Sequence, residues 1–546
     1  MKRLARTVAL LAALSLSACS FAPKYERPDM PLPEEWNIPE QAQSRLAQKW
    51  WRRFKDPALN ALVEEALEKN QDLEQALAAV NSAQAQLGVA TSFLFPSAAA
   101  GGGWSKNSLS LKGPTPVPPG MRTQSAYSGG LSASWELDLW GKYRNAYTAL
   151  SEILLGTQAA YTGMRLTTSG ATVRSYFALL ALDLQKSVVE RTVKTREDAL
   201  QIYTDRFSMG DITELDWLRA KAEVDVARVS LHQTLAALEA VEASLLTLLG
   251  RSPRDIMLQR PKRGRAIDLI PAIPILPAGL PSELLERRPD IRAAESALKA
   301  GNANIGSARA DYFPSISLTG SLGAQSEHLR DLFTRDARTW SYGIQGSVPI
   351  LDFGRNWWRV KDAEAQKQRA LAVYNKTVQS AFSDIRTALV QQRENAEIVK
   401  SFFSQVDSLS RAANLARVRY DNGYSSYLEV LDAERQLFGA EMQAATALAG
   451  RLNSIVDVCM ALGGGWDDGE EPEEDAPADD APEKAAPENI VEDAERDSSD
   501  RGDNTPKAGA RKAGVQEDGA PEDKAPEKAA PRRKGASKKA KEEPVL

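Results

Sequence analysis

The sequence predicts an all-α architecture of very long helices, joined to four β-strands of the membrane type that are set in two pairs. Three observations predict this fold class: long stretches without proline, short segments in which apolar and polar residues alternate, and an internal repeat. With 43% hydrophobic residues over 546 positions, the chain can also bury a large core.

The longest helices are expected where proline is absent. No proline occurs between Pro119 and Pro253, or between Pro349 and Pro472. A helix of about 60 residues would be roughly 90 Å long, because each residue adds about 1.5 Å. A globular core has no use for such lengths, so these helices are expected to pack as coiled coils.

The clearest strand signal is "LSASWELDLW", residues 131–140. Its odd positions, from Leu131 to Leu139, are all apolar, and its even positions include Glu136 and Asp138. A period of two residues places the apolar side chains on one face of a strand and the acidic ones on the other.

Two further segments, 315–323 and 340–350, alternate in the same way, and their lengths fit membrane β-strands of about 9–11 residues. A soluble sandwich is the alternative that alternation alone leaves open. Because open sheet edges are not tolerated in lipid, a membrane location would require several chains to share one barrel, of eight or twelve strands. Aromatic residues near the strand ends could form an interfacial belt: Trp104, Trp135, Trp140, Tyr342, Phe353, Trp357 and Trp358.

The internal repeat matches the two halves of the chain. Matching segments are 67–76 with 285–294 and 95–97 with 313–315, displaced by 218, then 141–142 with 354–355 and 206–215 with 419–428, displaced by 213. The change in displacement predicts a longer loop in the first half, at 110–124.

These matches define the expected domain organisation. The first structural repeat covers 57–270, with a strand pair at about 97–140. The second covers 271–466, with a strand pair at about 314–352.

The N-terminus resembles a bacterial lipoprotein signal. Residues 1–18 combine a basic start with a short apolar run, which is typical of a signal peptide. "LSAC", ending at Cys19, resembles a lipobox, and the alternative is a chance cysteine. Lipidation would make 19–56 the anchored N-terminal segment. Ser20 is not the aspartate that retains lipoproteins in the inner membrane, so the resemblance implies the outer membrane.

The C-terminal residues 467–546 have a different composition, with 24 acidic and 14 basic residues and almost no aromatic or β-branched ones. Such a tail cannot bury enough apolar surface to offset chain entropy and is expected to be disordered. A solvated tether is the default interpretation. The alternative is that the basic end, 511–546, binds an anionic partner such as the cell wall.

No pattern in the sequence indicates catalysis. His232 and His328 lie far apart without ligand-like neighbours, and Cys459 would be the one thiol left after lipidation. No zinc spacing, nucleophile elbow, phosphate loop or dinucleotide fingerprint is present. We therefore expect no enzyme, no catalytic residue, no cofactor or metal site, and no nucleic-acid partner.

Four segments together resemble the outer-membrane factor family, the TolC-like and OprM-like channels of tripartite efflux pumps. They are "WWRRFKDPALNALVEEAL" (50–67), "PAGLPSELLERRPDIRAAE" (277–295), "ADYFPSISLTGSLG" (310–323) and "RYDNGYSSYLEVLDAERQLF" (419–438). The resemblance implies a homotrimer in which four strands from each chain form one 12-stranded transmembrane β-barrel that continues into a long α-helical periplasmic barrel. In that arrangement Leu131 to Leu139 would face lipid, and Glu136 and Asp138 would face water inside the barrel.

The resemblance also implies a periplasmic gate. Leu428, Asp432 and Arg435 match the leucine, aspartate and arginine that close OprM-like channels at the helix tips. These positions share one helix face, so three copies would form an apolar ring beside charged ones. The alternative is a solvated helix face with an i, i+3 ion pair. The first half has Arg219 in place of the aspartate, so the closure cannot be fully symmetric.

The helix tips are the expected docking points for a periplasmic adaptor. Gly210 with Asp211, and Gly423 with Tyr424, occupy matching positions where the chain must reverse between coiled helices. An ordinary hairpin turn would use the same glycines.

The most consistent function is a passive trimeric duct for small molecules, that is drugs, toxic compounds or metal ions. It would receive them from a periplasmic adaptor and a proton-driven inner-membrane transporter. The alternatives are an outer-membrane channel for protein secretion and, less consistent with alternating strands, a lipid-anchored coiled-coil scaffold.

Overall fold

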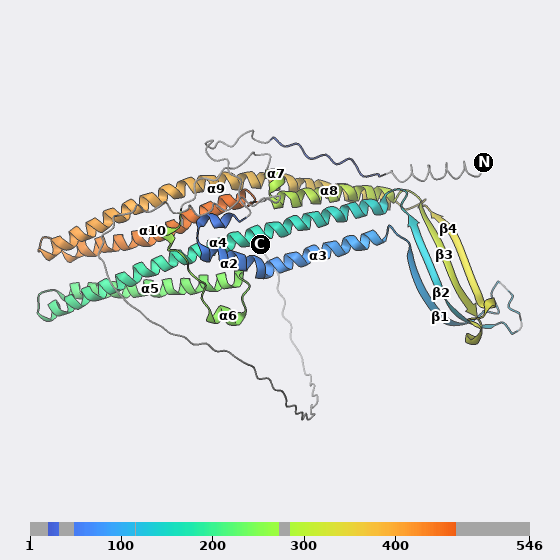
Figure 1. Ribbon diagram of the computed structural model, residues 1–546, viewed down its shortest axis with the longest axis horizontal. Helices are drawn as coiled ribbons and strands as arrows, with labels where there is room; N and C mark the ends of the chain where they lie inside the picture. Colours follow the sequence, from blue (N-terminus) through green and yellow to red (C-terminus); the bar gives the residue numbers. More distant parts are fainter. Residues whose placement is uncertain (1–19, 32–48, 115, 119, 272–283, 466–546) are drawn as a thin grey trace, which may run out of the picture. The chain divides into compact units, whose positions relative to one another are not determined.

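The computed structural model describes residues 20–31, 49–114, 116–118, 120–271 and 284–465, which lie in one compact unit. The described chain is mostly helical and has one four-stranded sheet, so the predicted combination of long helices and four strands is confirmed (Figure 1). The signal peptide, Cys19 and the tail from 467 onward lie outside the described residues.

The first half runs from two helices through a strand pair into a long helical hairpin. Its elements are η1 (Trp50–Phe54), α2 (Pro57–Lys69), α3 (Gln71–Ser92), β1 (Ser97–Ser108), β2 (Thr123–Leu137), α4 (Lys142–Ser208), α5 (Glu214–Leu248), α6 (Pro253–Leu258) and η2 (Ile267–Leu269).

The second half follows the same order. Its elements are α7 (Leu284–Arg287), α8 (Pro289–Ala310), β3 (Ser315–Ser326), η4 (Leu329–Asp331), η5 (Arg335–Ala337), β4 (Arg338–Ser347), α9 (Arg355–Asp421) and α10 (Tyr427–Ala461). Helices α4 and α9 each have 67 residues, and α5 and α10 each have 35. The two hairpins therefore have equal lengths, and their long helices exceed the expected 60 residues.

Each long helix begins at a glycine that the sequence repeat pairs with its counterpart. Gly141 and Gly354 precede α4 and α9 with φ of 74° and 84°, a left-handed conformation that glycine adopts without a steric penalty. A nearby carboxylate accepts the first helical N–H groups in each case, Asp138 from Arg144 at 2.8 Å and Asp352 from Asn356 at 3.1 Å.

This arrangement corrects one expectation. Asp138 does not face water within a strand, because β2 ends at Leu137 and the Asp138 side chain is held at the start of α4 by Arg144.

The strand predicted at 340–350 extended too far at its C-terminal end. Strand β4 ends at Ser347, two residues before Pro349, which has no N–H to donate to a ladder.

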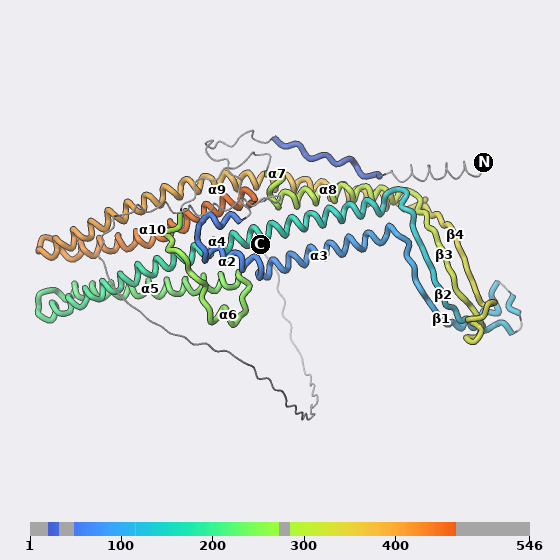
Figure 2. The backbone as a smooth tube through the Cα atoms, viewed as in Figure 1, coloured from blue at the N-terminus to red at the C-terminus, as the bar shows by residue number. Residues whose placement is uncertain are grey.

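The largest core lies where η1 and α2 pack against α4, α5 and α10. Trp50, Phe54, Tyr176, Leu245 and Val456 are fully buried there. Their segments are far apart in sequence, so this core fixes the two helical hairpins to one another. Figure 2 shows the chain leaving this region through α3 into β1 and returning from β2 into α4.

The sheet has the order β1-β2-β3-β4, and all its neighbours are antiparallel. One row of the register joins Trp135 of β2 to Leu318 of β3, and Leu318 to Ile344 of β4. The loop of the first pair, at 109–122, is longer than that of the second, at 327–337, as predicted. None of the described helices has an apolar stretch long enough to cross a bilayer.

Candidate functional site

The sheet has one apolar face and one polar face. The register places Leu131, Leu322 and Trp340 in one cross-strand row, and the adjacent row contains Ser132, Ser321 and Ser341. The other apolar-face residues are Trp104, Tyr127, Trp135, Leu318, Tyr342 and Ile344. The alternation seen in the sequence therefore continues across all four strands.

Both faces of the sheet are largely exposed among the residues that the structure describes. Every residue of β1 and β4 is exposed, and large apolar side chains such as Trp340 (71%) and Ile344 (77%) lie open on the sheet surface. Strands β1 and β4 are also the two edges of the sheet, with backbone groups free to pair. An apolar face of this extent needs another apolar phase or another chain to cover it.

The three gate candidates lie near the start of α10, and they do not pair with one another. Leu428 is about half exposed, and the Asp432 carboxylate accepts a hydrogen bond from Gln436 at 2.7 Å. Arg435 donates instead from Nε to Glu223 of α5 at 2.7 Å. The alternative i, i+3 ion pair between Asp432 and Arg435 is therefore not formed.

Glu223 is the residue that sequence reasoning missed here. Its side chain is 4% exposed and lies between Arg435 and the buried Arg196, which approaches Oε2 at 3.0 Å. Arg196 also donates to the Glu223 carbonyl at 2.9 Å. A buried carboxylate needs such partners because desolvation of an unpaired charge is costly. No sequence signal could show this cluster, since Glu223 and Arg435 are 212 positions apart.

Aromatic rings join the two hairpins beside this cluster. The ring of Tyr203 in α4 lies 4.3 Å from that of Tyr427 in α10 and 6.4 Å from that of Tyr420 in α9. Burial raises the pKa of Tyr427 to about 12, so its hydroxyl stays protonated at physiological pH. The gate candidates thus lie on a helix that is held against α4 and α5 by both charge and packing.

Both helix tips are tight turns closed by glycine. Gly210 and Gly423 have φ of 81° and 76°, and a side chain at either position would meet nothing within 4 Å. Asp211 donates its N–H back to Arg206 at 2.9 Å, as expected for a helix that ends at a left-handed glycine. Tyr424 is 78% exposed, so the second tip presents an aromatic ring to solvent.

The segment that follows the predicted lipid site is held on the helices. The Ser20 hydroxyl donates to Asn145 in α4 at 2.9 Å, and Arg27 forms an ion pair with Glu295 in α8 at 2.8 Å. Burial raises the pKa of the Glu295 carboxyl, but the Arg27 hydrogen bond brings it below its usual range. Residues 20–31 are therefore fixed against α4 and α8.

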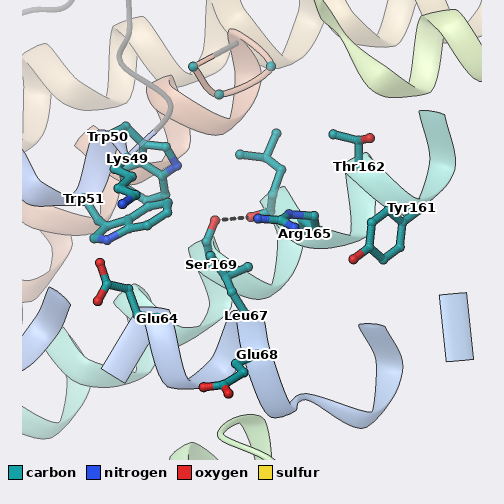
Figure 3. A pocket seen from close by; sticks show the side chains of 14 residues that line it. Lys49, Trp50, Trp51, Glu64, Leu67, Glu68, Tyr161, Thr162, Arg165 and Ser169 are labelled. Atoms are coloured by element: carbon teal, nitrogen blue, oxygen red, sulfur yellow. Dashed lines mark hydrogen bonds between the residues drawn. The ribbon is translucent and has the colours of Figure 1, made fainter. Parts of the chain in front are cut away.

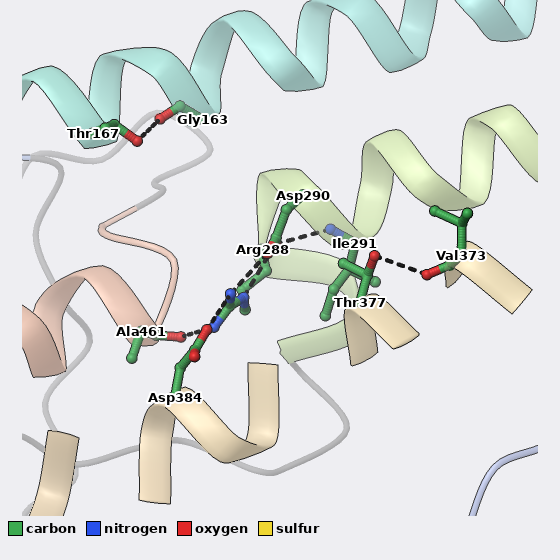
Figure 4. Close-up of polar contacts among 9 residues, drawn as sticks. All are labelled: Gly163, Thr167, Arg288, Asp290, Ile291, Val373, Thr377, Asp384 and Ala461. Atoms are coloured by element: carbon green, nitrogen blue, oxygen red, sulfur yellow. Dashed lines mark hydrogen bonds and ion pairs between the residues drawn. The ribbon is translucent and has the colours of Figure 1, made fainter. Parts of the chain in front are cut away.

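Arg288, in the segment "LLERRPDIRAAE", joins three helices (Figure 4). Its guanidinium donates to Asp290 at 2.7 Å, to Asp384 of α9 at 3.2 Å and to the Ala461 carbonyl at 2.9 Å. Burial lowers the pKa of Arg288, but the hydrogen bonds to the two carboxylates outweigh burial and raise this pKa above its usual value. The side chain therefore stays charged. This arginine caps the C-terminal end of α10 and ties it to α8 and α9.

We expect Arg288→Ala to lower the free energy of unfolding by about 2–3 kcal/mol, because several charged hydrogen bonds are lost at once. Arg288→Lys should recover only part of this, since lysine lacks the planar fork. The measurement is the thermal unfolding midpoint of the detergent-solubilised protein, with exposed Arg330→Ala as the control. Equal midpoints for the two alanine variants would contradict the assigned role.

A cavity of about 570 Å³ lies between η1, α2 and α4 (Figure 3). Its wall includes Trp50, Trp51, Arg165 and the hydroxyl of Ser169. That hydroxyl donates to the Leu166 carbonyl at 2.8 Å and not to a base. Ser169 is therefore not activated by a base in this structure.

The part of the chain that the structure describes contains no candidate metal site and no exposed thiol. No group of three or more His, Cys, Asp or Glu residues there could hold a metal ion. Cys459 is buried in α10 as predicted, and burial raises the pKa of its thiol to about 12. A buried thiol with a raised pKa is typical of a structural cysteine.

The fold and these surfaces define an outer-membrane efflux channel, and comparison with known proteins agrees. The family model described as "Outer membrane efflux protein" matches residues 62–251 and 280–464. The chain belongs to this family, whose members are outer-membrane channels and not enzymes.

Individual relatives match almost along their full length. The chain is 34% identical to outer membrane protein OprJ of Pseudomonas aeruginosa, covering 84% of this chain and 96% of that protein. It is 32% identical to the cation efflux system protein CusC of Escherichia coli, covering 83% and 97%. The crystal structure of the Campylobacter jejuni CmeC outer membrane channel superposes with a TM-score of 0.78 at 27% identity, covering 83% and 96%.

Proposed function

We propose that the chain is one subunit of a homotrimer that forms a passive duct across the outer membrane and the periplasm. Each subunit would contribute four strands to one 12-stranded barrel and its long helices to a tunnel. The observation that carries this proposal is the sheet, which exposes an apolar face, a polar face and two unpaired edges. Closure with two further copies would pair both edges and turn the apolar face to lipid.

The equal lengths of the two helical hairpins support the tunnel. Hairpins α4–α5 and α9–α10 have the same number of residues in each helix, so six such hairpins in a trimer would end at one level. We interpret the two halves as a structural repeat, with residues 57–270 and 271–466 as its units.

A lipid on Cys19 fits this arrangement. The Phe21 ring stacks on Phe313 with centroids 4.5 Å apart, and Phe313 lies just before β3. An N-terminus starting at residue 19 would therefore emerge where the helices meet the sheet, at the level of a membrane surface. Cleavage after residues 1–18 and acylation of Cys19 would anchor the duct at its periplasmic side.

The gate assignment rests on exposure and charge. Leu428 and Asp432 are exposed near the start of α10, on the face that the other helices leave uncovered, and they lie one turn apart. Three copies around an axis would place an apolar ring beside an acidic one. Arg435 would hold that helix against α5 through Glu223.

The duct would take solutes from a periplasmic adaptor at the tips around Gly210, Asp211, Gly423 and Tyr424. An inner-membrane transporter would supply the energy, because no nucleotide site is evident in this sequence. The resemblance to lipoprotein efflux channels favours a proton-driven one. Relatives are named for the efflux of antibiotics, solvents and cations, so drugs, toxic compounds and metal ions all fit as small-molecule substrates. The name of a relative alone does not choose between them.

The test is an in-cell photocrosslink from the tips, placed at Asp211 and Tyr424, with the exposed Met257 of α6 as the control position. We expect the tip positions, and not the control, to capture an adaptor together with a proton-driven transporter. Capture of an ATP-driven protein exporter would instead indicate an outer-membrane channel for protein secretion. Trimers that capture no inner-membrane partner would contradict docking and favour a scaffold.

A further inference from the structure

The polar face of the sheet is its concave face. Gly130 and Gly323 oppose each other on this face, and a Cβ built on Gly130 would lie only 2.7 Å from the Gly323 Cα. Side chains converge on the inner side of a curved sheet, and glycine is placed where the backbones approach most closely. The sheet therefore curves toward the row of serines and away from the row of apolar residues.

This concave face is lined by hydroxyl groups. A groove of about 340 Å³ lies on it and is lined by residues of all four strands. The hydroxyls beside it are those of Ser97, Ser132, Ser134, Thr319, Ser321 and Ser341. Several bond to each other, as Ser321 does to Ser341 at 2.8 Å and Ser97 to Ser134 at 3.0 Å.

One position on this face has a charge. Among the residues of the four strands, the ionisable ones at neutral pH are Lys106, Glu136 and Arg338. The register places Lys106 and Arg338 on the apolar face, because they alternate in step with Trp104 and Trp340. Glu136 pairs with Ser317 on the polar face, at the end of the sheet next to the helices.

The carboxylate of Glu136 also differs from the neighbouring carboxylates because no positively charged side chain pairs with it among the described residues. Asp138 pairs with Arg144, and Asp311 pairs with Lys142 at 3.0 Å. Among the described residues, Glu136 accepts one hydrogen bond, from the Tyr143 hydroxyl at 2.9 Å, and forms no ion pair. A hydroxyl partner orients the carboxylate but leaves its charge uncompensated.

We propose that Glu136 is the charge-selective residue of the barrel lumen. Three copies form an acidic ring at the helix-side end of an uncharged, hydroxyl-lined wall. The ring raises the local concentration of cations, and the hydroxyl wall hydrogen-bonds neutral and cationic solutes alike. The barrel therefore passes neutral and cationic small molecules in preference to anions. This inference rests on the proposed trimeric channel.

The test is the reversal potential of single channels in planar bilayers under a KCl gradient, with about 0.1 M on the dilute side, where charges act over about 10 Å. All variants also contain Asp432→Asn, so that the acidic ring at the tips cannot mask the effect. We expect Glu136→Gln to lower the potassium-to-chloride permeability ratio by about twofold or more, and Glu136→Lys to invert the preference.

Two controls separate charge from structure. Arg338→Gln changes one charge on the outer face and should leave the ratio unchanged, and Tyr143→Phe should keep the ratio because it keeps the carboxylate. An unchanged ratio in Glu136→Gln channels that still conduct would overturn the inference and leave the channel standing. The absence of any conductance from the parent protein would overturn the proposed channel and the inference together.

Discussion

Asp432→Ala is expected to raise the single-channel conductance of the protein in planar bilayers severalfold. Three carboxylates around the axis, one turn beyond the exposed Leu428, would narrow the tip of the tunnel and hold cations there. Removing the three carboxylates would widen the opening and remove the binding site for cations. The measurement is the current through single channels at fixed voltage and salt.

The matched control is Gln436→Ala. Gln436 donates the one side-chain hydrogen bond described for Asp432, so this variant breaks the same contact and keeps the charge. A gate made by the carboxylate ring predicts that the control stays near the parental conductance. If Asp432→Ala leaves the closed-state current unchanged, the assignment of Leu428, Asp432 and Arg435 to a gate is wrong.

The contacts of Arg435 explain why Asp432 is the better residue to change. Arg435 holds α10 against α5 through Glu223, which is buried and also paired with Arg196. Truncating Arg435 would leave the Glu223 carboxylate with one partner fewer in a buried site, which destabilises the packing of the hairpins. Its effect on conductance would then mix gating with loss of structure.

The sequence could predict elements whose signal is local. The absence of proline predicted both long helices. Gly141 and Gly354 were matched as positions of the repeat, and their left-handed conformation just before the two helices is a finding of the structure. Alternation predicted the strands because a period of two is visible within ten residues. The turns at Gly210 and Gly423 were also predicted from a local signal, because glycine allows the chain to reverse tightly between two helices.

The partners of individual side chains could not be predicted in this way, whether they are near or distant in the sequence. Asp138 continues the alternation of β2, and nothing in "WELDLW" shows that its carboxylate accepts the Arg144 N–H instead. For Arg435, i, i+3 spacing offered an ion pair with Asp432 only as the alternative to a gate, and no sequence pattern indicated its actual partner, Glu223. Burial of Glu223 beside Arg196 decides the pairing, and burial follows from how α4, α5 and α10 pack together.

The assignment of the two sheet faces leads to the largest expected effect on assembly. Leu131 and Ser132 are adjacent in β2, so they lie at the same depth and point to opposite faces. Leu131→Arg would place three guanidinium groups in lipid, at about 2–4 kcal/mol each near the middle of the bilayer, whereas Ser132→Arg would place them in water inside the barrel. We expect Leu131→Arg to remove the trimer from the outer-membrane fraction and Ser132→Arg to retain it, as measured by native gels of fractionated membranes. Because the two variants introduce the same arginine side chain one residue apart, equal assembly of both would show that the apolar face does not meet lipid.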